Sequence, residues 1–116
     1  MTAREQKLLA DIHSAAGEIP AKTRGKSEAD YLADRDLRLI VERLFLVIGE
    51  AAARLRRESP QTSDRLPQTR SAVAFRNFLI HVYDEINDRI VWRTVSDDIQ
   101  PLIAAVGRLL ASGGQR

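Results

Sequence analysis

An eight-residue stretch, RNFLIHVY at positions 76–83, contains the side chains with the clearest chemical potential. It brings Arg76, Asn77, His81 and Tyr83 together, and His81 is one of only two histidines in the chain. Arginine binds a phosphate through a planar fork of N–H donors, and a neutral imidazole takes up or releases a proton near pH 7. The stretch therefore holds the groups needed to cut RNA without a metal ion.

Helical periodicity predicts that these side chains lie on one amphipathic helix. At about 100° per residue, one arc of that helix is an apolar stripe of Phe75, Phe78, Leu79, Val82 and Ile86. Asn77 and His81 are four residues apart and thus neighbours on the helix surface. Arg76 and His81 are separated by roughly 140° and about 7.5 Å of rise, which suits two groups that flank one phosphodiester. The alternative is a solvated helix face that carries a chance histidine.

A single helix cannot surround a substrate, so a second surface must complete such a site. A two-fold homodimer would supply it, and two-fold dimers are the commonest oligomers. Each chain has one histidine in this stretch, so a proton donor and a proton acceptor together require both subunits. The acids nearby, Asp84, Glu85 and Asp88, are too scattered to form a cage for a hard cation, and we expect no metal and no cofactor.

The composition is that of an ordinary soluble globular protein. The 116 residues are 44% apolar and 29% charged, and we expect one domain over residues 1–116. The longest apolar block, LFLVI at 44–48, is too short to span a bilayer, and no secretory signal is visible, so we expect a cytoplasmic protein. A net charge of +2 is too small for a general nucleic-acid binder. The densest basic cluster, Arg54, Arg56 and Arg57, is either an RNA-backbone contact or a basic helix end favoured by the helix dipole.

The chain reads as helix throughout and predicts an all-α, antiparallel bundle of four to five helices. We expect helices over 3–18, with a stop soon after Pro20, over 27–33, and over 35–58. SPQTSDRLPQ (59–68) is the clearest loop, the motif helix covers about 69–86, and a last helix covers about 88–112, either kinked or restarted at Pro101. The tail from about residue 112 should be frayed. Leu44 to Ile48 put apolar surface all round the third helix, which makes it the central helix of the bundle, a dimer seam, or both.

Arg-Asn-x-x-x-His-x-Tyr resembles the R-x4-H-x-Y signature of HEPN-type ribonucleases, in particular the HepT-like toxins paired with minimal nucleotidyltransferase antitoxins. The resemblance covers roughly residues 8–105, including TRGKSEADYLADRDLRLIVERLFLVIGEAA before the motif and DEINDRIVWRTVSDDIQPL after it. It implies a HEPN-like bundle and an endoribonuclease that uses the 2′-hydroxyl of RNA as nucleophile. Arg76 would then clamp the phosphate, His81 would transfer the proton, and Asn77 would position the phosphate or the imidazole. Tyr83 would be the tyrosine that the cognate antitoxin modifies with AMP.

Two positions depart from the family's usual pattern, and they keep other functions open. Ala74 stands where the family commonly has glycine, and Val82 stands where small or acidic residues are more usual. The alternatives are a nucleotide- or RNA-binding module that does not cleave, and a structural partner of a nucleotidyltransferase. Glu50, in IGEAA, either faces the site or is a helix-surface acid, and we do not count it among the catalytic residues.

Overall fold

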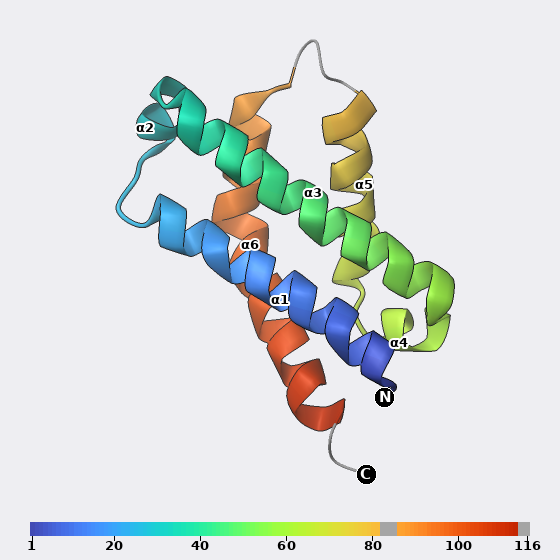
Figure 1. The fold of residues 1–116 in the computed structure, drawn as a ribbon. Helices are drawn as coiled ribbons and strands as arrows, with labels where there is room; N and C mark the ends of the chain where they lie inside the picture. The colour runs from blue at the N-terminus through green and yellow to red at the C-terminus, as the bar shows by residue number, and fades with distance from the viewer. Residues whose placement is uncertain (82–85, 114–116) are drawn as a thin grey trace.

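The computed structural model describes residues 1–81 and 86–113, and within these ranges the chain forms six helices and no strand (Figure 1). The helices are α1 (Ala3–Thr23), α2 (Glu28–Ala33), α3 (Arg35–Glu58), α4 (Pro60–Asp64), α5 (Gln68–His81) and α6 (Asp88–Gly113). Four of them are long, and α1 and α3 run side by side in opposite directions (Figure 1). The predicted all-α bundle is confirmed. None of the described helices is long and apolar enough to cross a membrane.

The first helix starts as predicted but extends further. Thr2 and Glu5 form a capping box, in which the Thr2 hydroxyl accepts from the Glu5 amide at 3.1 Å. A helix was predicted over 3–18 with a stop soon after Pro20, and α1 runs through Pro20 and ends three residues later at Thr23. Proline removes only its own N–H from the helix. The next turn is retained because Ile19 is buried and the Thr23 hydroxyl donates to the Ile19 carbonyl at 2.8 Å.

The segment predicted as a loop, residues 59–68, contains the short helix α4. Pro60 occupies its first turn, where a missing N–H costs nothing. The polar residues that suggested a loop are partly turned inward: the hydroxyls of Ser63 and Thr69 lie 3.0 Å apart, and both side chains are buried. Leu66 is buried between them and anchors the connection to the core.

The motif helix α5 is described from Gln68 to His81, and Ile86, its predicted last residue, is not helical, so the predicted end is wrong. Tyr83 and Val82 lie outside the described residues. Helix α6 is continuous through Pro101, which resolves the choice between one helix and two. It also includes Ser112 and Gly113, where fraying was predicted, and residues 114–116 lie outside the described part.

Helix α3 is the centre of the bundle. It packs against α1 on one side and α5 on the other, and α1 packs in turn on α6. In the apolar block, Phe45 and Ile48 are buried and Leu44, Leu46 and Val47 are half-buried. The central-helix interpretation is confirmed, and the dimer seam stays a prediction. The start of α3 is fixed by Asp34, whose carboxylate accepts from the Leu37 amide at 3.0 Å.

Candidate active site

Helix α5 presents the predicted polar group while its apolar face docks on α3. Leu79 is buried, and the ring of Phe75 meets the ring of Phe45 edge-on with centroids 4.8 Å apart. Phe78 stacks on Phe75 at 5.8 Å. These aromatic contacts fix the rotation of α5 about its axis, so that Arg76 and Asn77 lie at the α3–α5 boundary.

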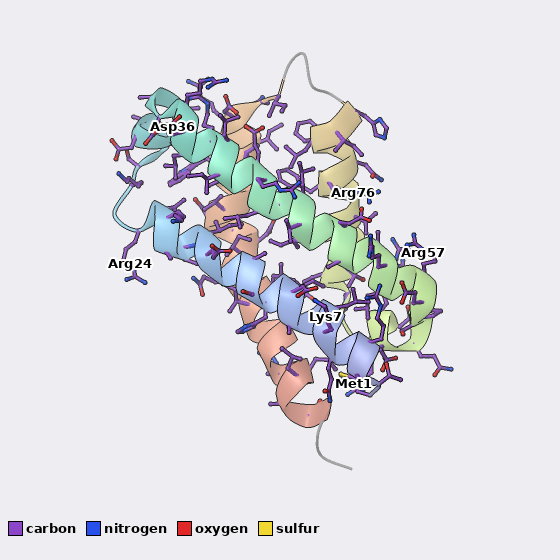
Figure 2. All side chains as sticks on the ribbon, in the orientation of Figure 1. Met1, Lys7, Arg24, Asp36, Arg57 and Arg76 are labelled. Atoms are coloured by element: carbon purple, nitrogen blue, oxygen red, sulfur yellow. The ribbon has the colours of Figure 1, made fainter. Side chains whose placement is uncertain are left out.

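Arg76 is the most constrained polar side chain of the site. Its Nη1 donates to Glu50 Oε2 at 2.7 Å, across to α3. Its Nε and Nη2 both donate to Asn77 Oδ1, at 3.2 and 2.8 Å. The Arg76 side chain is only 22% exposed, so its guanidinium is held against the protein surface with part of its fork open to solvent (Figure 2). Such charge-assisted contacts orient an arginine fork for planar recognition of an anion.

Gly49 explains how α5 comes so close to α3 at this point. A Cβ added at Gly49 would collide with Cβ of Arg76 and would lie 2.9 Å from the Ala72 carbonyl oxygen. Only a residue without a side chain allows this approach of two helix backbones. Gly49 therefore allows the backbone at Arg76 to pack closely against α3, and Glu50 next to it accepts a hydrogen bond from the Arg76 guanidinium.

Glu50 is the residue that sequence reasoning left aside. Its Oε1 accepts from Arg54 Nε at 3.3 Å and its Oε2 from Arg76. The hydrogen bond from Arg54, and then the contact with Arg76, hold the pKa of Glu50 below its usual range. Its position in IGEAA, directly after a glycine in a long helix, was the available signal.

His81 is the last described residue of α5, exposed and about one and a half turns beyond Arg76. The structure thus places Arg76, Asn77 and His81 on one helix, as predicted. It does not join Asn77 to His81, because the Asn77 carbonyl oxygen accepts from Arg76. Among the described residues, His81 makes no hydrogen bond. An exposed imidazole and a fixed guanidinium on one helix are groups that can transfer a proton and bind a phosphate.

Comparison with known proteins assigns the chain to a family. A family model described as "Ribonuclease HepT-like" matches residues 12–109, a range that includes Glu50, Arg76 and His81. The chain belongs to the HepT-like ribonuclease family. A protein of Thermococcus cleftensis named as a probable ribonuclease HepT is 30% identical over 102 residues, covering 88% of this chain and 92% of that protein. No solved structure matches.

Two further relatives are named as candidate RNases. The relative from Methanocaldococcus jannaschii is 27% identical over an alignment that covers 85% of this chain and 91% of the relative's length. The relative from Caldanaerobacter subterraneus is 32% identical over an alignment that covers 77% of this chain and 79% of the relative's length. The expected family resemblance and the expected class of enzyme, a ribonuclease, are thus confirmed.

The other tyrosine of this HepT-like chain, Tyr31, lies in the core. Tyr31 is fully buried, with its ring 5.3 Å from that of Trp92, and burial raises the pKa of its hydroxyl. An enzyme that modifies a tyrosine of the folded protein cannot reach it. Tyr83, the predicted modification site, lies outside the described residues.

No three histidine, aspartate or glutamate side chains of the described part of this HepT-like chain are grouped so as to hold a metal ion. The expected independence of metal concerns the reaction itself, and it stays a prediction for the assay proposed below.

Proposed function

We propose that this HepT-like chain is the toxin of a toxin–antitoxin pair and acts in the cytoplasm as a metal-independent endoribonuclease. The observation that carries the proposal is the fixed guanidinium of Arg76, bound by Glu50 and Asn77, on the same helix as an exposed His81. The match to the ribonuclease family over residues 12–109 supports the same chemistry.

The proposed reaction is an internal transesterification. The 2′-oxygen of a ribose attacks the neighbouring phosphorus, the bond from phosphorus to the 5′-oxygen breaks, and a cyclic phosphate and a 5′-hydroxyl remain. A base takes the proton of the 2′-hydroxyl and an acid gives a proton to the leaving 5′-oxygen. The charge that develops on the non-bridging oxygens needs donors placed in advance.

Arg76 would supply those donors, with Asn77 as its positioning residue. A guanidinium has five N–H groups, and the contacts with Glu50 and Asn77 occupy three of the nitrogens through one N–H each. Two N–H groups, one on each terminal nitrogen, are left to bind a phosphate. His81 would transfer the proton, a role that contributes about 10² to 10⁴-fold to the rate.

A homodimer would provide the second imidazole, one as base and one as acid. Large apolar side chains exposed on the described surface support an interface between copies: Leu39, Ile40, Ile80 and Ile90. Ile80 directly precedes His81, so such an interface would bring the two imidazoles towards one another. Light scattering of the purified protein tests for the dimer, and a monomer with full activity would contradict it.

Neutralisation would come from a cognate nucleotidyltransferase antitoxin that AMPylates Tyr83. Tyr83 follows Arg76 by seven residues, and a bulky anionic nucleotide beside the guanidinium would occupy the phosphate site and repel RNA. Mass spectrometry after incubation with the partner and ATP tests this step. Tyr83→Phe should abolish the modification, whereas Tyr31→Phe, at the buried tyrosine, should leave it unchanged.

The deciding experiment is incubation of the partner-free protein with total RNA in EDTA, followed by analysis of the 3′ ends. We expect cleavage that leaves cyclic phosphates, reduced about 10² to 10⁴-fold by His81→Ala. His13→Ala, which removes the other histidine on α1, is the matched control and should cleave as the unaltered protein does. Absence of cleavage by protein shown to be unmodified would contradict the nuclease proposal and favour a binding module.

A further inference from the structure

A basic groove runs between α1 and α3, separate from the Arg76 guanidinium on α5, which we call the clamp. It has a volume of about 270 Å³ and an apolar floor that includes Leu8, Leu46 and Val47. Its walls carry four cationic side chains against two carboxylates, Asp11 and Glu50. The cations are Arg4 and Lys7 on α1 and Arg43 and Arg54 on α3.

The spacing of these cations suits an extended polyanion. Arg43 and Arg54 are eleven residues apart on α3, three turns of helix, and are separated by about 16 Å along its axis. Arg4 and Lys7 lie about one turn apart on the facing helix. A strand of nucleic acid offers a phosphate at intervals of a few ångströms, so several phosphates would lie within reach of these four side chains.

Three of these cations have exposed carboxylate partners. Arg4 pairs with Glu58 at 3.0 Å, Lys7 with Asp11 at 3.1 Å and Arg54 with Glu50 at 3.3 Å, and the six side chains are 37–66% exposed. Arg43 pairs with no carboxylate in the described part of the chain. Exposed pairs contribute little, so a phosphate can replace the carboxylate partner at small cost.

Glu50 connects the groove to the proposed active site. One of its oxygens accepts from Arg54, which lines the groove, and the other accepts from Arg76. Lys7 and Arg76 lie on opposite sides of α3 in Figure 2, with the exposed surface of α3 between them. A chain of phosphates that crosses α3 at Glu50 would therefore reach both the groove and the clamp.

We infer that the α1–α3 groove binds backbone phosphates of the RNA strand next to the phosphate held at Arg76. This inference rests on the proposed function and extends it from one phosphodiester to a track along the strand. Because the groove would contact phosphates and not base edges, it would bind RNA without selecting a base sequence.

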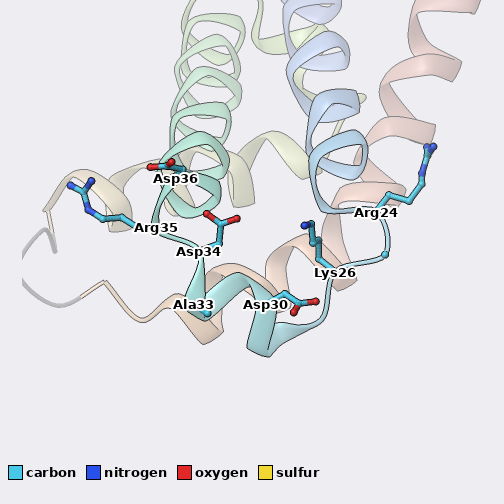
Figure 3. A pocket seen from close by; sticks show the side chains of 8 residues that line it. Arg24, Lys26, Asp30, Ala33, Asp34, Arg35 and Asp36 are labelled. Atoms are coloured by element: carbon cyan, nitrogen blue, oxygen red, sulfur yellow. The ribbon is translucent and has the colours of Figure 1, made fainter.

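A larger pocket at the corner of α1, α2 and α3 does not share these properties (Figure 3). Arg24, Lys26 and Arg35 line it, but so do Asp30, Asp34 and Asp36. Asp30 and Asp34 also cap helices through their carboxylates. With equal numbers of both charges it offers no net attraction for a polyanion, and its arginines are matched controls for those of the groove.

The test is binding of a fluorescent 2′-O-methyl oligouridine, which lacks the nucleophilic hydroxyl and is therefore not cleaved, measured by anisotropy across a range of salt concentrations. Arg43→Ala should remove one phosphate contact. The slope of the logarithm of the binding constant against the logarithm of the salt concentration should then become shallower by about 0.7, and binding should weaken about fourfold at 0.15 M salt. Arg43→Lys should restore most of the binding. Arg24→Ala, at the corner pocket, should change neither quantity beyond the small effect of net charge.

The inference is overturned if Arg43→Ala and Arg24→Ala behave alike, or if the protein does not bind the oligonucleotide. It is also overturned if polyglutamate binds in place of the oligonucleotide with the same dependence on Arg43, which would assign the groove to an acidic protein segment. Cleavage of total RNA is scored separately. If the protein cleaves RNA but Arg43→Ala does not change binding, only the groove inference is contradicted. If Arg43→Ala weakens binding but the protein does not cleave RNA, only the nuclease proposal is contradicted.

Discussion

Arg76 on α5 donates a 2.7 Å hydrogen bond to Glu50 on α3, so the guanidinium assigned to the substrate phosphate already holds a carboxylate in the free protein. A carboxylate and a phosphate present similar oxygen acceptors to an arginine fork. A phosphate bound to the two remaining N–H groups of Arg76 would therefore lie beside the Glu50 carboxylate, and the two negative charges would repel each other. Because the Glu50 side chain is 51% exposed, it can turn into solvent when RNA arrives.

The Glu50→Gln variant is expected to bind RNA more tightly, because the Glu50 charge that repels the phosphate is removed. Half-exposed ion pairs contribute about 0.2–1 kcal/mol, so the gain in affinity should not exceed about fivefold. Anisotropy with the 2′-O-methyl oligouridine measures it. Glu18→Gln, at an exposed position of α1, removes the same charge as a control. Weaker binding by Glu50→Gln alone would show that Glu50 holds Arg76 ready for phosphate instead of repelling the phosphate.

The sequence predicts that the candidate site residues share one helix, whereas it does not predict the contacts that they make. A motif of fixed spacing on a periodic helix predicts that Arg76, Asn77 and His81 share α5, since spacing within one helix fixes their positions. Glu50 is 26 residues away from Arg76 on another helix. Its contact depends on how α3 and α5 cross, which is set by Gly49 and the aromatic rings, and no local pattern encodes that.

The errors in the predicted fold have the same origin. Pro20 and the polar run at 59–68 are local signals for a break, and tertiary contacts override both. Buried Ile19 keeps α1 helical beyond the proline, and buried Leu66 holds a segment that composition assigns to solvent. Caps, by contrast, are local, and for this reason Ser27 and Asp34 were found at the predicted helix starts.

Gly49→Ala is expected to destabilise the protein and to lower cleavage, because the new Cβ would push Arg76 and the backbone at Ala72 away from α3. Crowding of a packed interface typically costs about 1–3 kcal/mol. Gly17→Ala is the matched control: it is helical, and a Cβ there meets nothing within 4 Å. That variant should be more stable by about 0.5–1 kcal/mol. Urea unfolding measures both, and equal effects would contradict the assigned role of Gly49.

Stability is expected to fall in acid as carboxylates with lowered pKa values take up protons. A backbone hydrogen bond from Thr2 is the main cause of the lowered pKa of Glu5, and Asp30 has the same relation to Ser27. Each such group stabilises the fold above its unfolded pKa of about 4, and the contribution is lost as the pH falls through the lower folded value. These groups by themselves should therefore leave Tm unchanged from pH 7 to about 5 and lower it below about 4. Glu5→Gln should have a shallower decline, and a parallel one would exclude Glu5 as a source.

Burial acts in the opposite direction on Glu42, which is half-buried on α3. Desolvation is the main cause of its raised pKa, and the negative charge of Asp88 adds to it. A carboxyl whose folded pKa is raised destabilises the protein above that value, so the penalty is present at neutral pH and disappears in acid. Glu42→Gln should raise Tm at pH 7 and lose this advantage near pH 4. An equal gain at both pH values would show that the effect of the substitution is not electrostatic.

Tyr31→Phe is expected to leave the free energy of unfolding unchanged or to raise it. The Tyr31 hydroxyl is buried and has no hydrogen-bond partner among the described residues, and an unsatisfied buried hydroxyl typically costs about 1–3 kcal/mol. Phenylalanine keeps the ring that packs on Trp92. Tyr31→Ala, which also removes the ring, should instead destabilise by about 3–5 kcal/mol. A clear loss of stability in Tyr31→Phe would mean that the hydroxyl is bonded after all. If the variant is stable, Tyr83 becomes its only tyrosine, so the absorbance titration of a single phenol then reports on the motif directly.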